Sequence, residues 1–289
     1  MDHTHKMKDG RLLGFAEFGD PKGIPIFYFH GFPGSRLEAG KFHDIAMANH
    51  IRLIGIDRPG MGMSTMNKNR SMLDWPADAV EFADALKIDK FSVIGHSGGA
   101  PFVAACAFAI PHRLHGAAIV SGMAPFEKPE SQMGMSGGQK IVNQTIKNMP
   151  WLTSMMMRLT RMMLKNPRMM DKMIHQLPEV DQVLFRDPKI GKDLINSTME
   201  AFRNGIDGPS YEMSLLFTKP WGFDLEKIIC PVTIWQGTLD TQAPLSHAKI
   251  YANFIPGAEL HIVENEEHHS LIKNHIGKIF RNISGEILG

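Results

Sequence analysis

The chain alternates short apolar runs with longer amphipathic stretches. Six runs rich in β-branched and aromatic residues, several of them closed by Gly or Asp, predict strands at residues 24–29, 51–56, 91–94, 116–120, 232–235 and 260–263. An earlier strand is expected over residues 11–18. Between the strands, residues 73–86 carry their apolar positions on one face and residues 99–110 are apolar almost all round, as two helices would be. This alternation predicts a mostly parallel, twisted α/β sheet flanked by helices.

The alternation breaks in residues 124–222, where no strand pattern is visible. Twelve of the 21 methionines lie between positions 123 and 173. An amphipathic helix is predicted by apolar residues that recur at three- and four-residue spacing, namely Leu152, Met155, Met156, Leu159, Met162 and Met163. We expect its apolar face to be helix core, and a second interpretation is that the methionines line an adaptable pocket. The chain is therefore divided into a core, residues 1–123 and 223–289, and an inserted helical cap, residues 124–222.

Charge and cysteine content narrow the range of partners and locations. The chain has 31 basic and 30 acidic residues, a formal charge of +1, which predicts no strong field for nucleic acid or anionic lipid. Residues 91–112 lack charged side chains over a span long enough to cross a bilayer, but they contain three glycines and two prolines. We interpret them as a buried strand, a turn and a buried helix. Cys106 and Cys230 are too few for a disulfide scaffold, so a cytoplasmic location is expected.

The strongest chemical signal is a serine between a predicted strand and a predicted helix. Residues 95–99 read GHSGG and match G-x-S-x-G. A reversal this sharp requires small residues beside Ser97 and places its hydroxyl at a helix N-terminus, where developing negative charge is favoured. A serine hydroxyl attacks a carbonyl only when a base removes its proton and an acid orients that base.

The acid and the base are expected after Ser97 in the chain, in that order. Asp240 follows the predicted strand at 232–235, whereas residues 121–126, after the preceding strand, contain no carboxylate. The loop after the last predicted strand ends in two adjacent candidates for the base, His268 and His269. Because the carboxyl ends of parallel strands share one sheet edge, these loops can meet the serine.

An oxyanion hole requires two backbone N–H groups that point at the developing charge. Gly98, directly after the serine, is expected to supply one of them. Residues 30–35 read HGFPGS and follow the first predicted parallel strand. Gly31 and Gly34 allow that loop to turn into the site, so the second donor is assigned to Phe32.

These motifs together resemble the α/β-hydrolase superfamily, in particular its capped serine esterases and its proline iminopeptidase-like branch. The resemblance rests on HGFPG at 30–34, DRPGMG at 57–62 with Ser64, GHSGG at 95–99, Asp240 and the histidine loop. It covers nearly the whole chain outside the cap and implies the α/β-hydrolase fold. It also implies that the loop from Asp57 to Ser64 is a structural part of the site.

The resemblance distinguishes between the two histidines. The family's last loop usually has a small or acidic pair, then the catalytic histidine, then a bulky residue. This pattern places His268 in the catalytic position and His269 in the bulky one. Glu267 occupies a position where the family usually has glycine.

The leading hypothesis is a serine hydrolase that cleaves a carboxylic ester of a small or medium apolar substrate through an acyl-enzyme. Ser97 would be the nucleophile, His268 the base and Asp240 the orienting acid, with Phe32 and Gly98 as oxyanion donors. The expected partner is therefore a small-molecule ester, and the expected assembly is a monomer or homodimer. Nucleic acid and membrane partners are not expected.

Two other functions stay open at this point. An aminopeptidase of the proline iminopeptidase type would need cap carboxylates for the substrate's free amine, and the candidates are Glu179, Asp181, Glu200 and Glu212. That family's loop has a second glycine where this chain has Phe32. The second alternative function is a ligand sensor that keeps the triad but turns over slowly. No H-E-x-x-H, paired C-x-x-C or G-x-G-x-x-G motif is present, so neither a metal nor another cofactor is expected.

Overall fold

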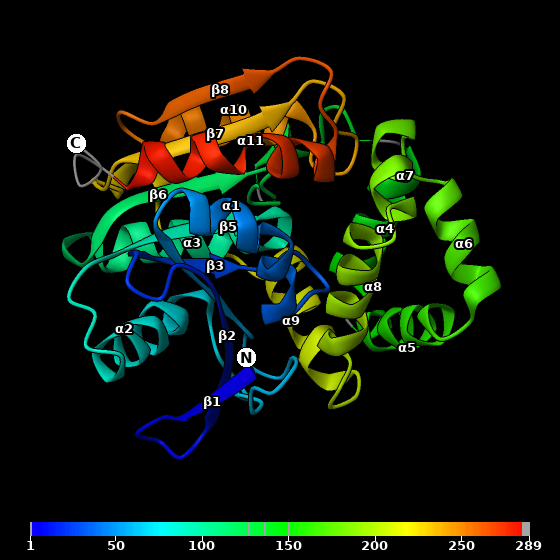
Figure 1. Cartoon of the computed structure of the whole chain (residues 1–289). Helices are drawn as coiled ribbons and strands as arrows, with labels where there is room; N and C mark the ends of the chain where they lie inside the picture. The colour runs from blue at the N-terminus through cyan, green and yellow to red at the C-terminus, as the bar shows by residue number, and fades with distance from the viewer. Residues whose placement is uncertain (1, 127, 136, 150, 285–289) are drawn as a thin grey trace.

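A single mixed sheet organises the computed structural model, which describes residues 2–126, 128–135, 137–149 and 151–284 (Figure 1). Its strand order is β1-β2-β4-β3-β5-β6-β7-β8. The strands are β1 Asp2–Lys6, β2 Leu12–Gly19, β3 Ile24–Phe29, β4 Ile51–Ile56, β5 Phe91–His96, β6 Leu114–Val120, β7 Val232–Gly237 and β8 Glu259–Val263. Pairing is antiparallel between β1 and β2 and between β2 and β4, and parallel from β4 to β8.

All seven predicted strands are present in the sheet. The sequence patterns missed β1, whose residues DHTHK are polar and mostly exposed. An edge strand pairs along one side and need not bury a face, so it leaves no apolar signature in the sequence. The antiparallel hydrogen bonds to β2 hold it in place instead.

Helices cover both faces of the sheet, and the strand side chains alternate between them. On one face α2 (Trp75–Ala85), α3 (Ala100–Ala109) and α10 (Leu245–Phe254) contribute side chains to the core cluster that contains Phe27 and Phe29. On the other face α1 (His43–Ala48) and α11 (His268–Ile283) contribute to the cluster that contains Ile26 and Tyr28. This two-faced burial explains why the parallel strands read as continuous apolar runs.

The uncharged segment 91–112 folds as predicted into a strand, a turn and a helix. It contains β5, a short 3₁₀ turn over Ser97–Gly99, and α3. None of the described helices has the length and apolar character needed to cross a bilayer.

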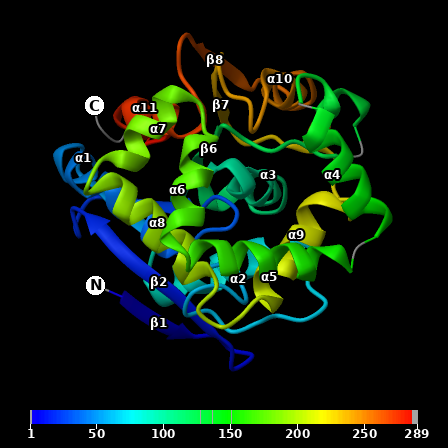
Figure 2. The same cartoon turned by 90° about the vertical axis from the view of Figure 1, so that its right-hand side faces the viewer.

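Between β6 and β7 the regular elements of the described residues are all helical. The longer ones are α4 Gly137–Asn148, α5 Leu152–Leu164, α6 Pro167–His175, α7 Glu179–Arg186, α8 Ile190–Ala201 and α9 Asp207–Phe217. Figure 1 shows them gathered on one side of the molecule, the side toward which the parallel strands point, and Figure 2 views them from that side. They contact the rest of the chain where α8 packs on the 3₁₀ helix Arg36–Phe42 and α7 packs on α11.

Helix α5 is present as predicted, but only part of its apolar stripe is core: Leu152, Met156 and Met163 are half-buried, and Met156 packs against a buried cluster. Met155, Leu159 and Met162 are 57%, 49% and 55% exposed. The helix packs on α9 and buries a different side, which carries Met157 and Leu164. Spacing alone showed that an amphipathic helix forms here, not which side would find a partner.

Candidate active site

The turn after β5 holds Ser97 in a conformation that few side chains adopt. Its φ is 54°, in the left-handed region. A side chain at Gly99 would collide with the carbonyl oxygen of Phe29 on β3, and one at Gly95 would meet Val103 on α3 at 2.7 Å. The G-x-S-x-G pattern is therefore explained by close contact between β3, β5 and α3.

Asp240 and His268 meet after β7 and at the start of α11. His268 Nδ1 lies 2.9 Å from Asp240 Oδ2, and both side chains are buried. The backbone N–H groups of Gln242 and Ala243 donate to Asp240 Oδ1 at 2.9 Å each. Gln236 donates to Oδ2 at 3.2 Å. These bonds orient the Asp240 carboxylate toward the His268 ring.

The pair influences the protonation of both partners. Burial works to raise the pKa of Asp240, but the His268 ring and the donated hydrogen bonds outweigh it and hold that pKa below its ordinary value. Burial works to lower the pKa of His268, but the Asp240 carboxylate outweighs it and raises that pKa. With its Nδ1 proton directed at Asp240, the neutral ring presents Nε2 as a proton acceptor.

A cavity of about 240 Å³ is lined by Ser97, His268 and Phe32. Most of its wall is apolar and comes from the inserted helices, through Leu164, Met170, Met173, Ile174, Leu177, Phe185, Leu194 and Ile195. Gly98 adjoins Phe32: a side chain on Gly98 would lie 2.6 Å from Phe32 Cβ and 3.3 Å from its backbone nitrogen. The five predicted residues are thus brought to one place, with Asp240 joined to the cavity through His268.

The methionine prediction holds in part for this cavity. Met170 and Met173 of α6 line it. The six apolar residues of α5 that carried the prediction do not line it, and α5 contributes Leu164 instead.

His269 also lines the cavity but has different contacts. Its ring packs against Phe185 and His96, and among the described residues it is His268, not His269, that bonds to Asp240. Burial, together with the neighbouring His268, holds the pKa of His269 well below its ordinary value. The ring is therefore neutral near pH 7 and fills the bulky position of the loop.

A buried carboxylate that the sequence analysis missed links the parts of the site. Glu38 accepts hydrogen bonds from Tyr28 Oη and from the Gly31 N–H, both at 2.8 Å, and lies 3.0 Å from His96 Nδ1. The other ring nitrogen of His96 lies 3.1 Å from the carbonyl oxygen of His268. Glu38 therefore ties the proposed oxyanion loop to the residue before Ser97 and, through His96, to the histidine loop.

A second carboxylate, Asp181, comes from the inserted helices and has a role other than the amine binding considered from the sequence. Asp181 on α7 is fully buried and accepts the backbone N–H groups of His269, at 3.1 and 3.2 Å, and Ser270, at 3.0 Å. Burial raises its pKa despite these bonds. Asp181 thus caps the N-terminus of α11, the helix that begins with His268.

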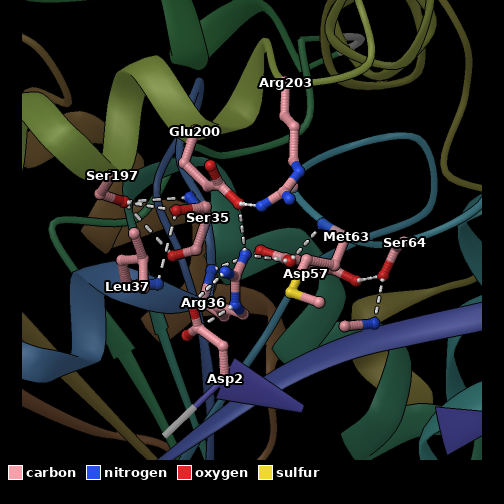
Figure 3. Close-up of polar contacts among 12 residues, drawn as sticks. Asp2, Ser35, Arg36, Leu37, Asp57, Met63, Ser64, Ser197, Glu200 and Arg203 are labelled. Carbon is pink, nitrogen blue, oxygen red and sulfur yellow. Dashed lines mark hydrogen bonds and ion pairs between the residues drawn. The ribbon is translucent and has the colours of Figure 1, made fainter. Parts of the chain in front are cut away.

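The loop after β4 has the structural character that the family resemblance implied. Asp57 is fully buried and accepts from the Arg36 backbone at 2.6 Å, from Arg36 Nη1 at 2.8 Å and from the Met63 N–H at 2.8 Å (Figure 3). Ser64 donates to the Asp57 carbonyl at 2.6 Å. Burial, opposed by Arg36, raises the pKa of Asp57 to about 6. Arg36 also pairs with Glu200 on α8 at 2.8 Å, so this network joins the sheet to the inserted helices.

The four carboxylates considered for an amine substrate do not line the cavity. Glu212 is fully buried between Arg58, at 2.6 Å, and Arg70, at 3.2 Å. Glu200 is paired with arginines, Asp181 caps α11, and Glu179 is exposed. Among the described residues, no three His, Cys, Asp or Glu side chains are grouped so as to hold a metal ion.

Comparison with known sequences decides the family. Residues 24–275 match the sequence model of a family described as "alpha/beta hydrolase fold". The chain belongs to the α/β-hydrolase family. The predicted resemblance and fold class are confirmed by this match and by a solved neighbour. The esterase EaEST from Exiguobacterium antarcticum superposes on this α/β hydrolase with a TM-score of 0.75 at 18% identity, covering 98% of this chain and 99% of that one.

Curated relatives of this α/β hydrolase have diverse descriptions. The uncharacterized hydrolase YcgS of Bacillus subtilis strain 168 is 24% identical over 90% of this chain and 89% of that protein. A proline iminopeptidase of Xylella fastidiosa strain 9a5c is 31% identical over 36% of this chain and 34% of its own length. The dihydrolipoyllysine-residue acetyltransferase component of the acetoin cleaving system of Pseudomonas putida is 34% identical over 39% of this chain and 30% of its own length. The last two matches thus span about a third of those relatives.

Proposed function

We propose that this α/β hydrolase is a serine esterase that cleaves the carboxylic ester of a small or medium apolar substrate through an acyl-enzyme. The observation that carries the proposal is the hydrogen bond between His268 and Asp240 on a cavity that Ser97 also lines. A base oriented by a carboxylate beside a serine on a strained turn is the arrangement that activates an alcohol as a nucleophile.

The chemistry proceeds in two transfers of the acyl group. Ser97 Oγ attacks the ester carbonyl while His268 Nε2 takes its proton, and Asp240 stabilises the imidazolium that forms. The N–H groups of Phe32 and Gly98 hold the oxyanion of the tetrahedral intermediate. His268 then returns the proton to the departing alcohol. Water, activated by the same base, releases the acid from Ser97.

The inserted helices are proposed to act as a cap that limits substrate size. Helices α6 and α8 supply much of the apolar wall of the cavity. Its volume of about 240 Å³ lies below the roughly 300–1,000 Å³ of sites for drug-sized ligands. A short acyl chain or a small alcohol group therefore fits the enclosed space best.

The aminopeptidase alternative has support from the similarity to proline iminopeptidases but lacks a partner for the substrate's amine. Among the described residues that line the cavity, Glu38 is the acidic one. It already accepts from Tyr28 and Gly31 and contacts His96. An ammonium group would have to compete with these buried bonds, so the cavity favours an uncharged substrate.

A panel of chromogenic substrates tests the proposal. We expect sustained hydrolysis of para-nitrophenyl acetate and butyrate, declining for longer chains, with slower release of nitroaniline from proline para-nitroanilide. Ser97→Ala should lower kcat/KM for the esters by about 10⁴-fold or more. Ser154→Ala, an exposed serine of α5 outside the cavity, is the matched control and should retain the wild-type rate.

Three outcomes of this panel would contradict the esterase proposal. Ester hydrolysis that survives Ser97→Ala would overturn the assignment. A preference for the proline anilide would favour the aminopeptidase. A burst of one product per protein without further turnover would favour a ligand sensor.

A further inference from the structure

Positive charge is concentrated in one part of the inserted helices. Residues 137–175 contain seven basic residues and one acidic residue, Asp171, whereas the other residues of the chain contain 24 basic and 29 acidic ones. The total of +1 therefore combines a strongly basic segment with an acidic remainder. The basic residues are Lys140, Lys147, Arg158, Arg161, Lys165, Arg168 and Lys172, and all except Arg161 are exposed.

The same segment exposes large apolar side chains to solvent. Trp151 is 63% exposed, whereas Trp75, Trp221 and Trp235 are buried. Ile141 and three residues of α5, Met155, Leu159 and Met162, are exposed as well. Exposed apolar side chains that cluster in this way mark contact surfaces, whereas isolated ones need no explanation.

On α5 the apolar and basic side chains share one side of the helix. At 100° per residue, Trp151, Met155, Met162, Arg158 and Lys165 fall within about 80° of one another. The opposite side carries Met157 and Leu164, which are buried, and the helix packs on α9. Figure 2 shows α5 and α6 on the outer side of the molecule. Among the described residues, no ion pair joins Arg158 or Lys165 to an acidic side chain.

We propose that this outer surface of α5 and α6, carrying Trp151, Met155 and Met162 together with Arg158, Lys165 and Arg168, binds the anionic headgroups of a lipid bilayer. Basic side chains are attracted to acidic lipids, while apolar side chains enter the boundary between headgroups and acyl chains. Tryptophan is enriched at that depth. The contact is peripheral and does not depend on the proposed esterase activity.

Charge argues against the other occupants of this surface. A second copy of the chain would bring two equally basic surfaces together, which like-charge repulsion opposes. Nucleic acid would neutralise the charge but leave Trp151, Met155 and Met162 in water. A bilayer with acidic headgroups complements both properties of the surface.

Flotation of the full chain with vesicles tests the proposal. We expect binding to vesicles of phosphatidylcholine mixed with phosphatidylglycerol, weaker binding to phosphatidylcholine alone, and release by high salt. Binding should shift Trp151 emission to shorter wavelength. Trp151→Phe should remove most of that shift while the protein still floats with the mixed vesicles.

Matched variants separate this surface from general charge. Arg158→Gln with Lys165→Gln should weaken binding to the mixed vesicles by about fivefold for each charge removed. Lys22→Gln with Lys90→Gln removes the same charge from exposed lysines that precede β3 and β5, at the opposite sheet edge, and should bind like wild type. Met155→Ser with Met162→Ser should also lose binding. Circular dichroism checks that each variant is folded.

Several results would overturn the proposal. The protein could bind neutral and mixed vesicles equally, or bind neither. The Lys22 and Lys90 variant could also lose as much binding as the Arg158 and Lys165 variant. Capture of a purified acidic protein without vesicle binding would assign the surface to a protein partner. A solution dimer that Met155→Ser with Met162→Ser dissociates would assign it to a second copy.

Discussion

A single carboxylate, Asp240, controls the protonation of the proposed base. Its charge and its hydrogen bond to Nδ1 outweigh burial and raise the pKa of His268. The ring must be neutral to accept the Ser97 proton, so activity should rise with pH through the His268 pKa. The position of this acidic limb therefore reports the interaction between the two side chains.

Asp240→Asn should lower kcat by about 10⁴-fold, because the neutral amide neither fixes the tautomer nor stabilises the imidazolium. Loss of the charge also lowers the His268 pKa, so the acidic limb of kcat/KM should move to lower pH. A pH profile of ester hydrolysis measures both effects. Asp224→Asn, at an exposed aspartate far from the cavity, should leave the profile unchanged. An acidic limb that stays in place in Asp240→Asn would contradict this role.

Glu267 should make the fold less stable as pH rises. Burial, with Asp181 and Asp240 nearby, raises its pKa from 4.5 to about 7, and only His268 among the groups acting on it works in the other direction. Between these two pKa values the unfolded chain releases the proton while the folded chain retains it. The free energy of unfolding should therefore decrease as pH rises from about 4.5 to about 7.

Glu267→Gln removes this titration. The melting temperature of the variant relative to wild type should therefore increase as pH rises across that range, which thermal unfolding on both sides of it would measure. A difference between variant and wild type that does not change with pH would show that Glu267 is ionised in the folded state.

At the scale of elements, α7 and α11 are joined through Asp181. Asp181→Ala removes the acceptor of two backbone N–H groups at the start of α11. The free energy of unfolding should fall by about 1–2 kcal/mol. The acidic limb of the pH profile should also move to lower pH, because a negative charge near His268 is lost. Asp181→Asn keeps one acceptor oxygen and should recover part of the stability. It should not restore the position of the acidic limb, because the negative charge is still missing.

Glu179→Ala is the control for Asp181, since it lies on the same helix and is exposed. Urea unfolding and the pH profile should both resemble wild type for this variant. If Asp181→Ala behaved in the same way, α7 would not influence the histidine loop.

The sequence predicted the elements that are buried on defined faces and missed those held by distant partners. The parallel strands and α3 are apolar because both faces of the sheet are covered, so their pattern was readable. β1 is held by edge hydrogen bonds. The orientation of α5 is set by its packing on α9, which begins 43 residues after α5 ends.

The residues of the site divide in the same way. Ser97 and Gly98 lie in one local motif and Phe32 in another. Chain order indicated Asp240 and the histidine loop. Glu38 and Asp181 pair with groups 58 and 88 residues away. No local spacing indicates such pairs, because they form only when separate elements pack together.

At the scale of the whole molecule, buried charges connect the inserted helices to the sheet. Glu212 on α9 lies between Arg58 and Arg70, and all three are buried. Glu212→Gln leaves two buried guanidinium groups without their carboxylate and should lower the free energy of unfolding by about 3–5 kcal/mol. Urea unfolding measures the change, with the exposed Glu226→Gln as control. A loss no greater than that of the control would show that water or rearrangement replaces the pair.

Covalent labelling tests the central claim most directly. A fluorophosphonate reacts with a serine only where a base and an oxyanion hole activate it, so the labelled peptide identifies the nucleophile. We predict a single label on Ser97 in the wild-type chain, no label in Ser97→Ala, and strongly slowed labelling in His268→Ala. A label on another residue, or wild-type labelling in Ser97→Ala, would contradict the account.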